Sequence, residues 1–275
     1  MKNESLVEIL MPKVIELVEE VGDFIVDERR NFDMNRVEEK SPRNLVSYVD
    51  KTAEEKLIDG LSILLPNSSF LSEEFHSLEI LDELSWIIDP LDGTTNFVHN
   101  FPLYTVSIAL AVEQELMLGI VYDPLHKEMF HAIRDHGAYL NERQIHVSKT
   151  STFNNSLWAT GFPYQNFSKL KEYVDFFYHL IKVSHGVRRL GSAAADLAWT
   201  ACGRVDGFYE YGLSPWDVAG GAIIVKEAGG KITNFTGGDE VLFSKEIIAS
   251  NSLIHDEFMN NFEKIYFSRP LKSQF

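Results

Sequence analysis

Apolar residues recur at helical spacing in the first part of the chain. Residues 4–32 place leucine, isoleucine and valine every three or four positions, with Glu and Lys between them. This pattern predicts an amphipathic helix, and Pro12 either kinks it or marks a later start. The polar stretch 31–44 predicts an exposed loop or hairpin. Asp50 then precedes residues 51–65, which predict a second helix.

Shorter apolar runs follow and predict strands. Residues 68–74 and 84–89 are two such runs, near enough in sequence to pair with each other. Between residues 104 and 141, further runs are separated only by tight turns, which indicates antiparallel pairing.

The pattern changes after about residue 150, where strands and helices alternate. Helices are predicted at 168–183, 191–203, 216–230 and 255–265, and strands at 156–162, 205–212, 231–235 and 246–250. Alternation of this kind indicates an α/β arrangement. We therefore divide the chain into an α+β half, residues 1–148, and an α/β half, residues 149–275. Because no flexible linker separates them, the halves are expected to form one integrated unit.

Composition narrows the class of protein. Of the 275 residues, 45% are hydrophobic, which suffices for a substantial core. The formal net charge of -16 argues against nucleic-acid binding. An acidic chain could still bind an anionic substrate, but only with local positive charge from metal ions or helix N-termini. The single cysteine, Cys202, excludes an internal disulfide and a thiolate zinc cluster. Neither a signal peptide nor a bilayer-length apolar run is present, so we expect a cytoplasmic protein with no membrane partner.

The stretch WIIDPLDGTTNF, residues 86–97, ends an apolar run with two carboxylates, Asp89 and Asp92. With a turn carbonyl and the Thr94 hydroxyl, they can form a site for a hard cation. Gly93 lets the backbone approach a ligand closely, and the Gly93 and Thr94 amides can face an anion. The alternative is a simple strand-exit turn, in which Asp92 or Thr94 caps a helix that begins near Thr95.

Four further residues have equally ordinary alternatives. Glu73 ends a short strand, where a glutamate is usually solvated, but this strand end can lie beside that of Asp89. Asp217 and Asp50 each precede a predicted helix and can be simple N-caps. Lys40, in the polar loop, is by default a solvated lysine.

Taken together, the carboxylates indicate a metal site more strongly than any one of them does. Five of them lie at predicted ends of helices or strands: Asp50, Glu73, Asp89, Asp92 and Asp217. Oxygen ligands favour magnesium or manganese over zinc or copper. No HExxH, GxxxxGK[ST], GxGxxG or GxSxG occurs, which argues against a zinc peptidase, a P-loop, Rossmann binding and α/β-hydrolase chemistry.

Two long segments resemble the two signatures of the magnesium-dependent inositol monophosphatase family: WIIDPLDGTTNFVHNFP and WDVAGGAIIVKEAGG. SEE, NLVSYVD and RRLGSAAADLA follow the order of that family, so the resemblance covers nearly the whole chain. It implies a layered α-β-α-β-α sandwich of the inositol monophosphatase and fructose-1,6-bisphosphatase type. It also implies a homodimer and a lithium-sensitive phosphatase with two or three Mg²⁺ per active site, for which Mn²⁺ can substitute.

The resemblance also assigns roles to residues. The residues matching ligands or partners of the water-activating metal are Glu73, Asp89, the Leu91 carbonyl and Thr94. Those matching ligands of the second metal are Asp89, Asp92 and Asp217. Most of these metal ligands lie in the first half of the chain.

The remaining implied roles concern the water, the phosphate and the alcohol. Asp50 pairs with Thr94 to orient the nucleophilic water, and the Gly93 and Thr94 amides match the phosphate-binding amides. Lys40 lies in the mobile loop near a third metal. The substrate wall is implied to consist of Asp92, Gly191, Ala193 and Glu210.

The implied reaction is hydrolysis of myo-inositol monophosphate to inositol and phosphate. NADP(H), fructose-1,6-bisphosphate and 3′-phosphoadenosine-5′-phosphate phosphatases of the same superfamily remain alternatives, as does a non-catalytic metal-binding regulatory protein. The chain departs from the family at NERQ, residues 141–144, and in a short segment between Glu73 and Asp89, which puts the access route in doubt. Leu91 replaces a frequent isoleucine, which matters little where only its carbonyl binds.

Overall fold

The computed structural model describes residues 2–33, 35, 37–41, 44–75, 81–164 and 166–267, with no side-chain description for residues 2–4, 40, 41 and 44. The N-terminal elements are two long helices joined by a hairpin: α1 (Lys2–Arg30), β1 (Val37–Ser41), β2 (Asn44–Ser47) and α2 (Tyr48–Leu64). Helix α1 runs continuously through Pro12, so this proline does not mark its start. The predicted hairpin is confirmed, with β1 and β2 antiparallel.

A seven-stranded sheet follows, in the order β3-β4-β5-β6-β7-β8-β9. Its strands are β3 (Ser69–Ser72), β4 (Leu84–Asp92), β5 (Thr105–Val112), β6 (Glu115–Asp123), β7 (Glu128–Ile133), β8 (Ala138–Leu140) and β9 (Arg143–Ile145). Neighbours from β4 to β9 are antiparallel, as the tight turns predict. Strands β3 and β4 pair in parallel, so their carboxyl ends lie at the same edge of the sheet.

The second half of the chain builds a five-stranded mixed sheet, in the order β11-β10-β12-β14-β13. Its strands are β10 (Leu157–Thr160), β11 (Gly186–Arg188), β12 (Gly207–Tyr211), β13 (Lys231–Thr233) and β14 (Glu246–Ser250). The helices are η2 (Phe153–Asn155, a 3-10 turn), α4 (Leu170–Val183), α5 (Ala193–Ala201), α6 (Pro215–Glu227) and α7 (His255–Tyr266). Strand β11 and the turn η2 are absent from the sequence-based prediction.

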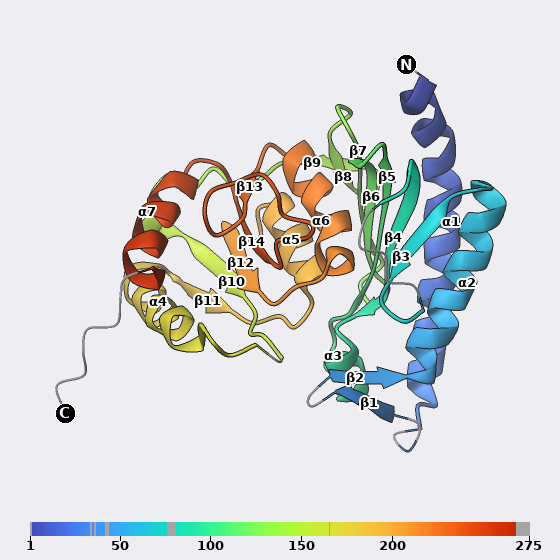
Figure 1. The fold of residues 1–275 in the computed structure, drawn as a ribbon, viewed down its shortest axis with the longest axis horizontal. Coiled ribbons are helices and arrows are strands. Elements are labelled where there is room, and N and C mark those ends of the chain that lie inside the picture. The colour runs from blue at the N-terminus through green and yellow to red at the C-terminus, as the bar shows by residue number, and fades with distance from the viewer. Residues whose placement is uncertain are drawn as a thin grey trace.

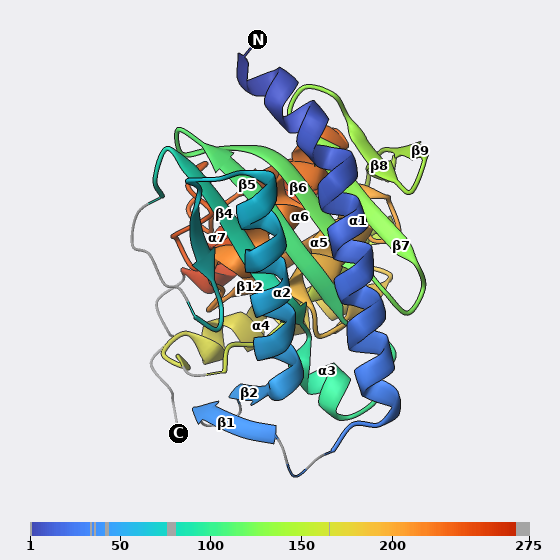
Figure 2. The same cartoon turned by 90° about the vertical axis from the view of Figure 1, so that its right-hand side faces the viewer.

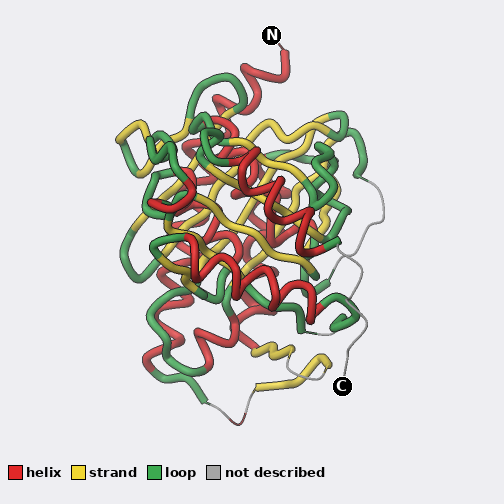
Figure 3. The backbone as a smooth tube through the Cα atoms, turned by 90° about the vertical axis from the view of Figure 1, so that its left-hand side faces the viewer, coloured by secondary structure: helices red, strands yellow, loops and turns green. Residues whose placement is uncertain are grey.

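Helices and sheets alternate in five layers (Figure 1). Helices α4 and α7 cover the outer face of the five-stranded sheet, and α5 and α6 lie between the two sheets. Helices α1 and α2 cover the far face of the seven-stranded sheet, as Figure 2 shows face on, and Figure 3 shows the opposite, α4–α7 side. The predicted α-β-α-β-α sandwich is therefore confirmed. The division at residue 148 stays a prediction.

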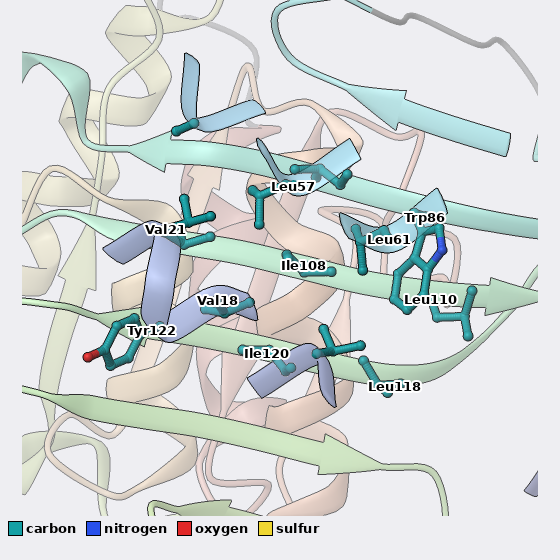
Figure 4. Packing of buried hydrophobic residues seen from close by; sticks show 14 of the residues in the cluster. Val18, Val21, Leu57, Leu61, Trp86, Ile108, Leu110, Leu118, Ile120 and Tyr122 are labelled. Carbon is teal, nitrogen blue, oxygen red and sulfur yellow. The ribbon is translucent and has the colours of Figure 1, made fainter. Parts of the chain in front are cut away.

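The packing explains why the layers hold together. Apolar residues of α1 and α2, among them Val18 and Leu57, meet Ile108 and Ile120 of the seven-stranded sheet (Figure 4). An aromatic cluster fills the space under α4 and α7, where Phe258 packs against other aromatic rings. Burial of such side chains stabilises each by roughly 1.5–3 kcal/mol.

Helix α6 approaches the seven-stranded sheet unusually closely because its contact residues are small. A Cβ at Gly220 would lie 2.8 Å from the Ile120 carbonyl oxygen, and one at Gly119 would lie 2.6 Å from the Gly220 carbonyl oxygen. Only glycines allow backbones to meet at this distance. This close approach sets the depth at which the first turn of α6 enters the space between the sheets.

In the described part of the chain, no helix is both long and apolar enough to cross a bilayer.

Candidate active site

The first site residue is Asp50, in the first turn of α2. Ser47 is the N-cap, and its amide and hydroxyl donate to the Asp50 carboxylate at 2.8 and 2.6 Å. Asp50 is therefore the N3 residue of a capping box. The expectation that Asp50 precedes the helix as its N-cap is wrong, because Ser47 already satisfies that position.

Glu73 follows strand β3 at the edge where β4 also ends. The segment that carries it is held by Glu54, a fully buried residue of α2. The Glu54 carboxylate accepts hydrogen bonds from the Glu74 and Phe75 amides, both at 2.9 Å, and from the Ser72 hydroxyl. Three bonds to one buried carboxylate hold the backbone directly after Glu73 and the Ser72 side chain directly before it.

The exit of β4 brings the next group of residues together. Strand β4 continues through Pro90 to Asp92, three residues beyond the predicted end, with an irregularity in its pairing to β5. Here the Leu91 amide donates to Asp89 at 3.0 Å. The Thr94 hydroxyl lies 2.9 Å from Asp50 Oδ1 and 3.1 Å from the Leu91 carbonyl oxygen.

The short helix α3 (Thr94–Val98) begins directly after this turn. Its N-cap is Gly93, with φ of 97° and no side-chain cap. The alternative in which Asp92 or Thr94 caps this helix is therefore wrong. Gly93 adopts a left-handed conformation that other residues rarely tolerate, and a Cβ there would lie 3.2 Å from the Gly191 carbonyl oxygen.

Asp92 points instead at the N-terminus of α5. Its Oδ2 accepts hydrogen bonds from the Ser192 hydroxyl and the Ala194 amide, each at 2.7 Å. Burial raises the pKa of Asp92 to about 6, although these two bonds oppose the shift. Asp92 thus ties the exit of β4 to the second half of the chain.

Asp217 enters from the first turn of α6. Ser214 is the N-cap, Pro215 occupies the first turn, and the Ser214 amide donates to Asp217 Oδ2 at 2.7 Å. Like Asp50, Asp217 is the N3 residue of a capping box, so the N-cap alternative is wrong for it too.

The carboxylates from these segments face one small cavity of about 80 Å³. Its lining includes Glu73, Asp89, Leu91, Asp92, Gly93, Thr94 and Asp217. Burial raises the pKa of Asp89 well above its usual range, and the charges of Glu73, Asp92 and Asp217 raise it further. Burial and the charges of Asp92 and Glu73 do the same for Asp217. Buried carboxylates that repel each other in this way favour an arrangement with a cation between them.

The donor set suits a hard cation that keeps part of its water shell. Among the described residues, no three His, Cys, Asp or Glu side chains converge closely enough to hold an ion by themselves. Mg²⁺ seldom needs such a cage, since it usually binds one or two carboxylates, several waters and the substrate phosphate. All side-chain donors at this cavity are oxygens.

A second cavity of about 80 Å³ adjoins the first, and both are lined by Asp92, Gly191 and Asp217. Ala193 and Glu210 also line it, and their role as a substrate wall stays a prediction. Burial raises the pKa of Glu210 to about 8 against the opposing charge of Arg189.

The second cavity depends on a glycine. A Cβ at Gly161 would collide with the Glu210 carboxylate, so the bare backbone there makes room for that group. Lys40 belongs to β1, and its side chain lies outside the described part of the structure.

Several residues at the site are absent from the sequence-based prediction. Glu54, Ser192, Arg189 and Asp196 contribute contacts or charge, as described here and below. The sequence marks two of them only weakly, since Glu54 lies on an apolar helix face and Asp196 lies in a run of small apolar residues. Charged residues are rarely buried, so a charged residue at a position that is expected to be buried indicates a special role.

Comparison with known proteins agrees with this geometry. The inositol monophosphatase family profile matches residues 7–266. Nus factor SuhB of Escherichia coli K12 is 38% identical over 241 residues, 87% of this chain and 90% of that protein. An inositol-1-monophosphatase of Synechocystis sp. is 41% identical over 215 residues, 78% of this chain and 75% of that protein.

A solved structure shows the same fold. The crystal structure of the extragenic suppressor protein SuhB from Bartonella henselae superposes with a TM-score of 0.87 at 35% identity, covering 93% of this chain and 98% of that one. The family match spans almost every described element, from α1 to α7. The chain belongs to the inositol monophosphatase family.

Proposed function

We propose that the chain is a Mg²⁺-dependent phosphomonoesterase that hydrolyses myo-inositol monophosphate to inositol and phosphate. One observation carries the proposal: Glu73, Asp89, Asp92 and Asp217, from three separate segments, line one cavity beside the hydrogen-bonded pair Asp50 and Thr94. Family membership supports the same reaction class.

The residues at the cavity fit two metal positions. Glu73, Asp89 and the Leu91 carbonyl would contribute to the site of the first ion, and Asp89, Asp92 and Asp217 to that of the second. Waters and the substrate phosphate would supply the remaining ligands, because no three carboxylates of the described residues converge closely enough to hold an ion alone. Bound Mg²⁺ would lower the pKa of the attacking water and stabilise the leaving oxygen. Two or three ions per site are proposed, with Mn²⁺ as a possible substitute and Li⁺ as an inhibitor.

The chain's own groups orient the water and the phosphate. Asp50 is fixed by Ser47 and accepts from Thr94, so the Thr94 hydroxyl can in turn accept a hydrogen bond from the attacking water. Proton transfer through such a positioned pair contributes roughly 10²–10⁴-fold to a rate. The Gly93 and Thr94 amides are proposed to bind the phosphate oxygens.

Glu210, across the second cavity, is proposed to bind hydroxyls of the leaving alcohol. Above about pH 8, where Glu210 is ionised, a hydrogen bond to its charged carboxylate is worth about 1.5–3 kcal/mol, which is roughly ten- to a hundredfold in kcat/KM. Removal of the carboxyl in Glu210→Ala should therefore cost turnover of inositol phosphate that much more than turnover of p-nitrophenyl phosphate. An equal loss on both substrates would show that Glu210 supports the metal cavity instead.

Related phosphatases remain alternatives for the physiological substrate, namely those acting on NADP(H), fructose-1,6-bisphosphate or 3′-phosphoadenosine-5′-phosphate. Phosphate release across a panel of these compounds separates them.

The Escherichia coli relative is named a Nus factor, so a non-catalytic role is a second candidate. Retention of the whole carboxylate set favours the enzyme. Metal binding without turnover of any panel compound would favour the non-catalytic role. A homodimer is also proposed.

A further inference from the structure

Asp196 is a buried carboxyl group that takes no part in the proposed binding of metal and phosphate. It lies in the first turn of α5, is 1% exposed, and lines the second cavity together with Gly161, Arg189 and Glu210. Its position is thus fixed beside the group proposed to bind the leaving alcohol.

One oxygen of this carboxyl has no hydrogen-bond partner. Among the described residues, no donor or acceptor lies within reach of the buried Asp196 Oδ1. Buried polar atoms in folded proteins are almost always hydrogen-bonded, because an unpaired one loses its bonds to water without replacement. An unpaired oxygen on a cavity wall therefore indicates a group that is completed by a ligand.

Stabilisation of the helix does not account for Asp196. An acidic residue in a first turn can interact with the helix dipole or with free amides. In α5, however, the Ala194 amide already donates to Asp92 and the Ala195 amide to the Ser192 hydroxyl. The N-terminus of the helix is capped without Asp196, so a structural role leaves its burial unexplained.

The charges around Asp196 bear on what it can bind. Burial raises its pKa well above the usual range, the charges of Glu210 and Asp92 raise it further, and Arg189 opposes them. A carboxyl group in this setting can be protonated near neutral pH and then donates a hydrogen bond as well as accepting one. A hydroxyl group, which also does both, is a suitable partner.

We propose that Asp196 is a second substrate-recognition residue, which binds a hydroxyl of the leaving alcohol beside the hydroxyl bound by Glu210. The proposal rests on the proposed function and narrows its substrate class. The preferred substrates are phosphomonoesters of polyols that present at least two free hydroxyls to this wall. Esters with no hydroxyl on the leaving group gain nothing from Asp196.

The test compares two substrates in wild type, Asp196→Ala and the control Asp59→Ala, which removes an exposed aspartate from α2. The expected loss of kcat/KM for myo-inositol 1-phosphate in Asp196→Ala exceeds the loss for p-nitrophenyl phosphate by ten- to a hundredfold, mainly through KM. The melting temperature should stay level or rise, because an unpaired buried carboxyl is removed. Asp59→Ala should leave the ratio unchanged.

Three results would overturn the inference. An equal loss on both substrates, with or without a lower melting temperature, would show that Asp196 does not select the alcohol, and no loss on either substrate would move recognition elsewhere. Wild type that hydrolyses p-nitrophenyl phosphate but no polyol phosphate would remove the proposed substrate class and Asp196's role with it. Wild type inactive on every phosphomonoester would instead refute the proposed function itself, which separates that failure from the other three.

Discussion

The Thr94 hydroxyl lies 2.9 Å from Asp50 Oδ1, although 44 residues separate the two in the sequence. Asp50 is held from the other side by Ser47 at the start of α2, and Thr94 opens α3 after the exit of β4. The pair therefore joins the helical layer to the edge of the sheet where the carboxylates gather.

This pair predicts a specific mutational pattern. Thr94→Ala should lower kcat by roughly 10²–10⁴-fold, since the hydroxyl between Asp50 and the water is lost, whereas Thr94→Ser should retain most activity. Asp50→Asn combined with Thr94→Ala should be little worse than either change alone, because the two act as a unit. Additive losses, measured as kcat in a double-mutant cycle, would show that the residues act independently.

Glu54 predicts an effect on metal affinity from a residue outside the cavity. In Glu54→Gln, the side-chain NH2 group would replace one carboxylate oxygen and would face a group that now donates a hydrogen bond to Glu54. Two donors would then oppose each other, which should cost about 1–3 kcal/mol of stability. The Mg²⁺ concentration for half-maximal activity should rise, because the backbone around Glu73 is released.

The matched control for this prediction is Glu55→Gln, one residue along the same helix and exposed. Thermal unfolding and Mg²⁺ titration of both variants provide the comparison. Identical behaviour of the two variants would mean that Glu54 does not position the Glu73 segment.

His255 predicts a dependence of stability on pH. It is 1% exposed, lies 2.8 Å from the Ser250 hydroxyl and 3.1 Å from that of Thr233, and burial lowers its pKa to about 4, from 6.5 in the unfolded chain. Between these values the unfolded state binds the extra proton. Stability is therefore fully present above pH 6.5 and falls as the pH drops toward 4, by at most about 3 kcal/mol.

Thermal unfolding at pH 7 and pH 5 checks this effect. The fall in melting temperature should be smaller in His255→Gln than in wild type, and His146→Gln, which alters an exposed histidine, should behave like wild type. Equal falls in all three proteins would assign the pH dependence to other groups.

The fold was predictable to the extent that periodicity and turns determine it. The long helix α1, the antiparallel strands and the strand–helix alternation all have local signals. Strand β11 has only three residues and depends on pairing with β10, so no local pattern marks it. The end of β4 was misplaced because Pro90 usually ends a strand, whereas here it falls at an irregularity in the pairing.

The residues that line the two cavities include most of those named from the sequence, whereas their roles stay predictions and their geometry was less predictable. The N-cap alternative for Asp50 and Asp217 was wrong, because Ser47 and Ser214, three residues before them, are the true N-caps. The sequence shows the spacing Ser-x-x-Asp at both places. This spacing resembles a capping box, in which Glu or Gln usually occupies the N3 position. The roles of Glu54 and Asp196 depend on contacts between distant segments, which one sequence does not encode locally.

The central claim is that Asp89 and its neighbours hold catalytic Mg²⁺, and one measurement tests it directly. Phosphate release from myo-inositol 1-phosphate is followed against Mg²⁺ concentration in wild type, Asp89→Asn and Glu74→Gln, with folding checked by circular dichroism. The account predicts that wild type needs Mg²⁺ and stops with EDTA, that Asp89→Asn loses activity by orders of magnitude while folded, and that Glu74→Gln changes it only a few-fold. Full wild-type activity in metal-free buffer, or equal activity of the two variants, would contradict it.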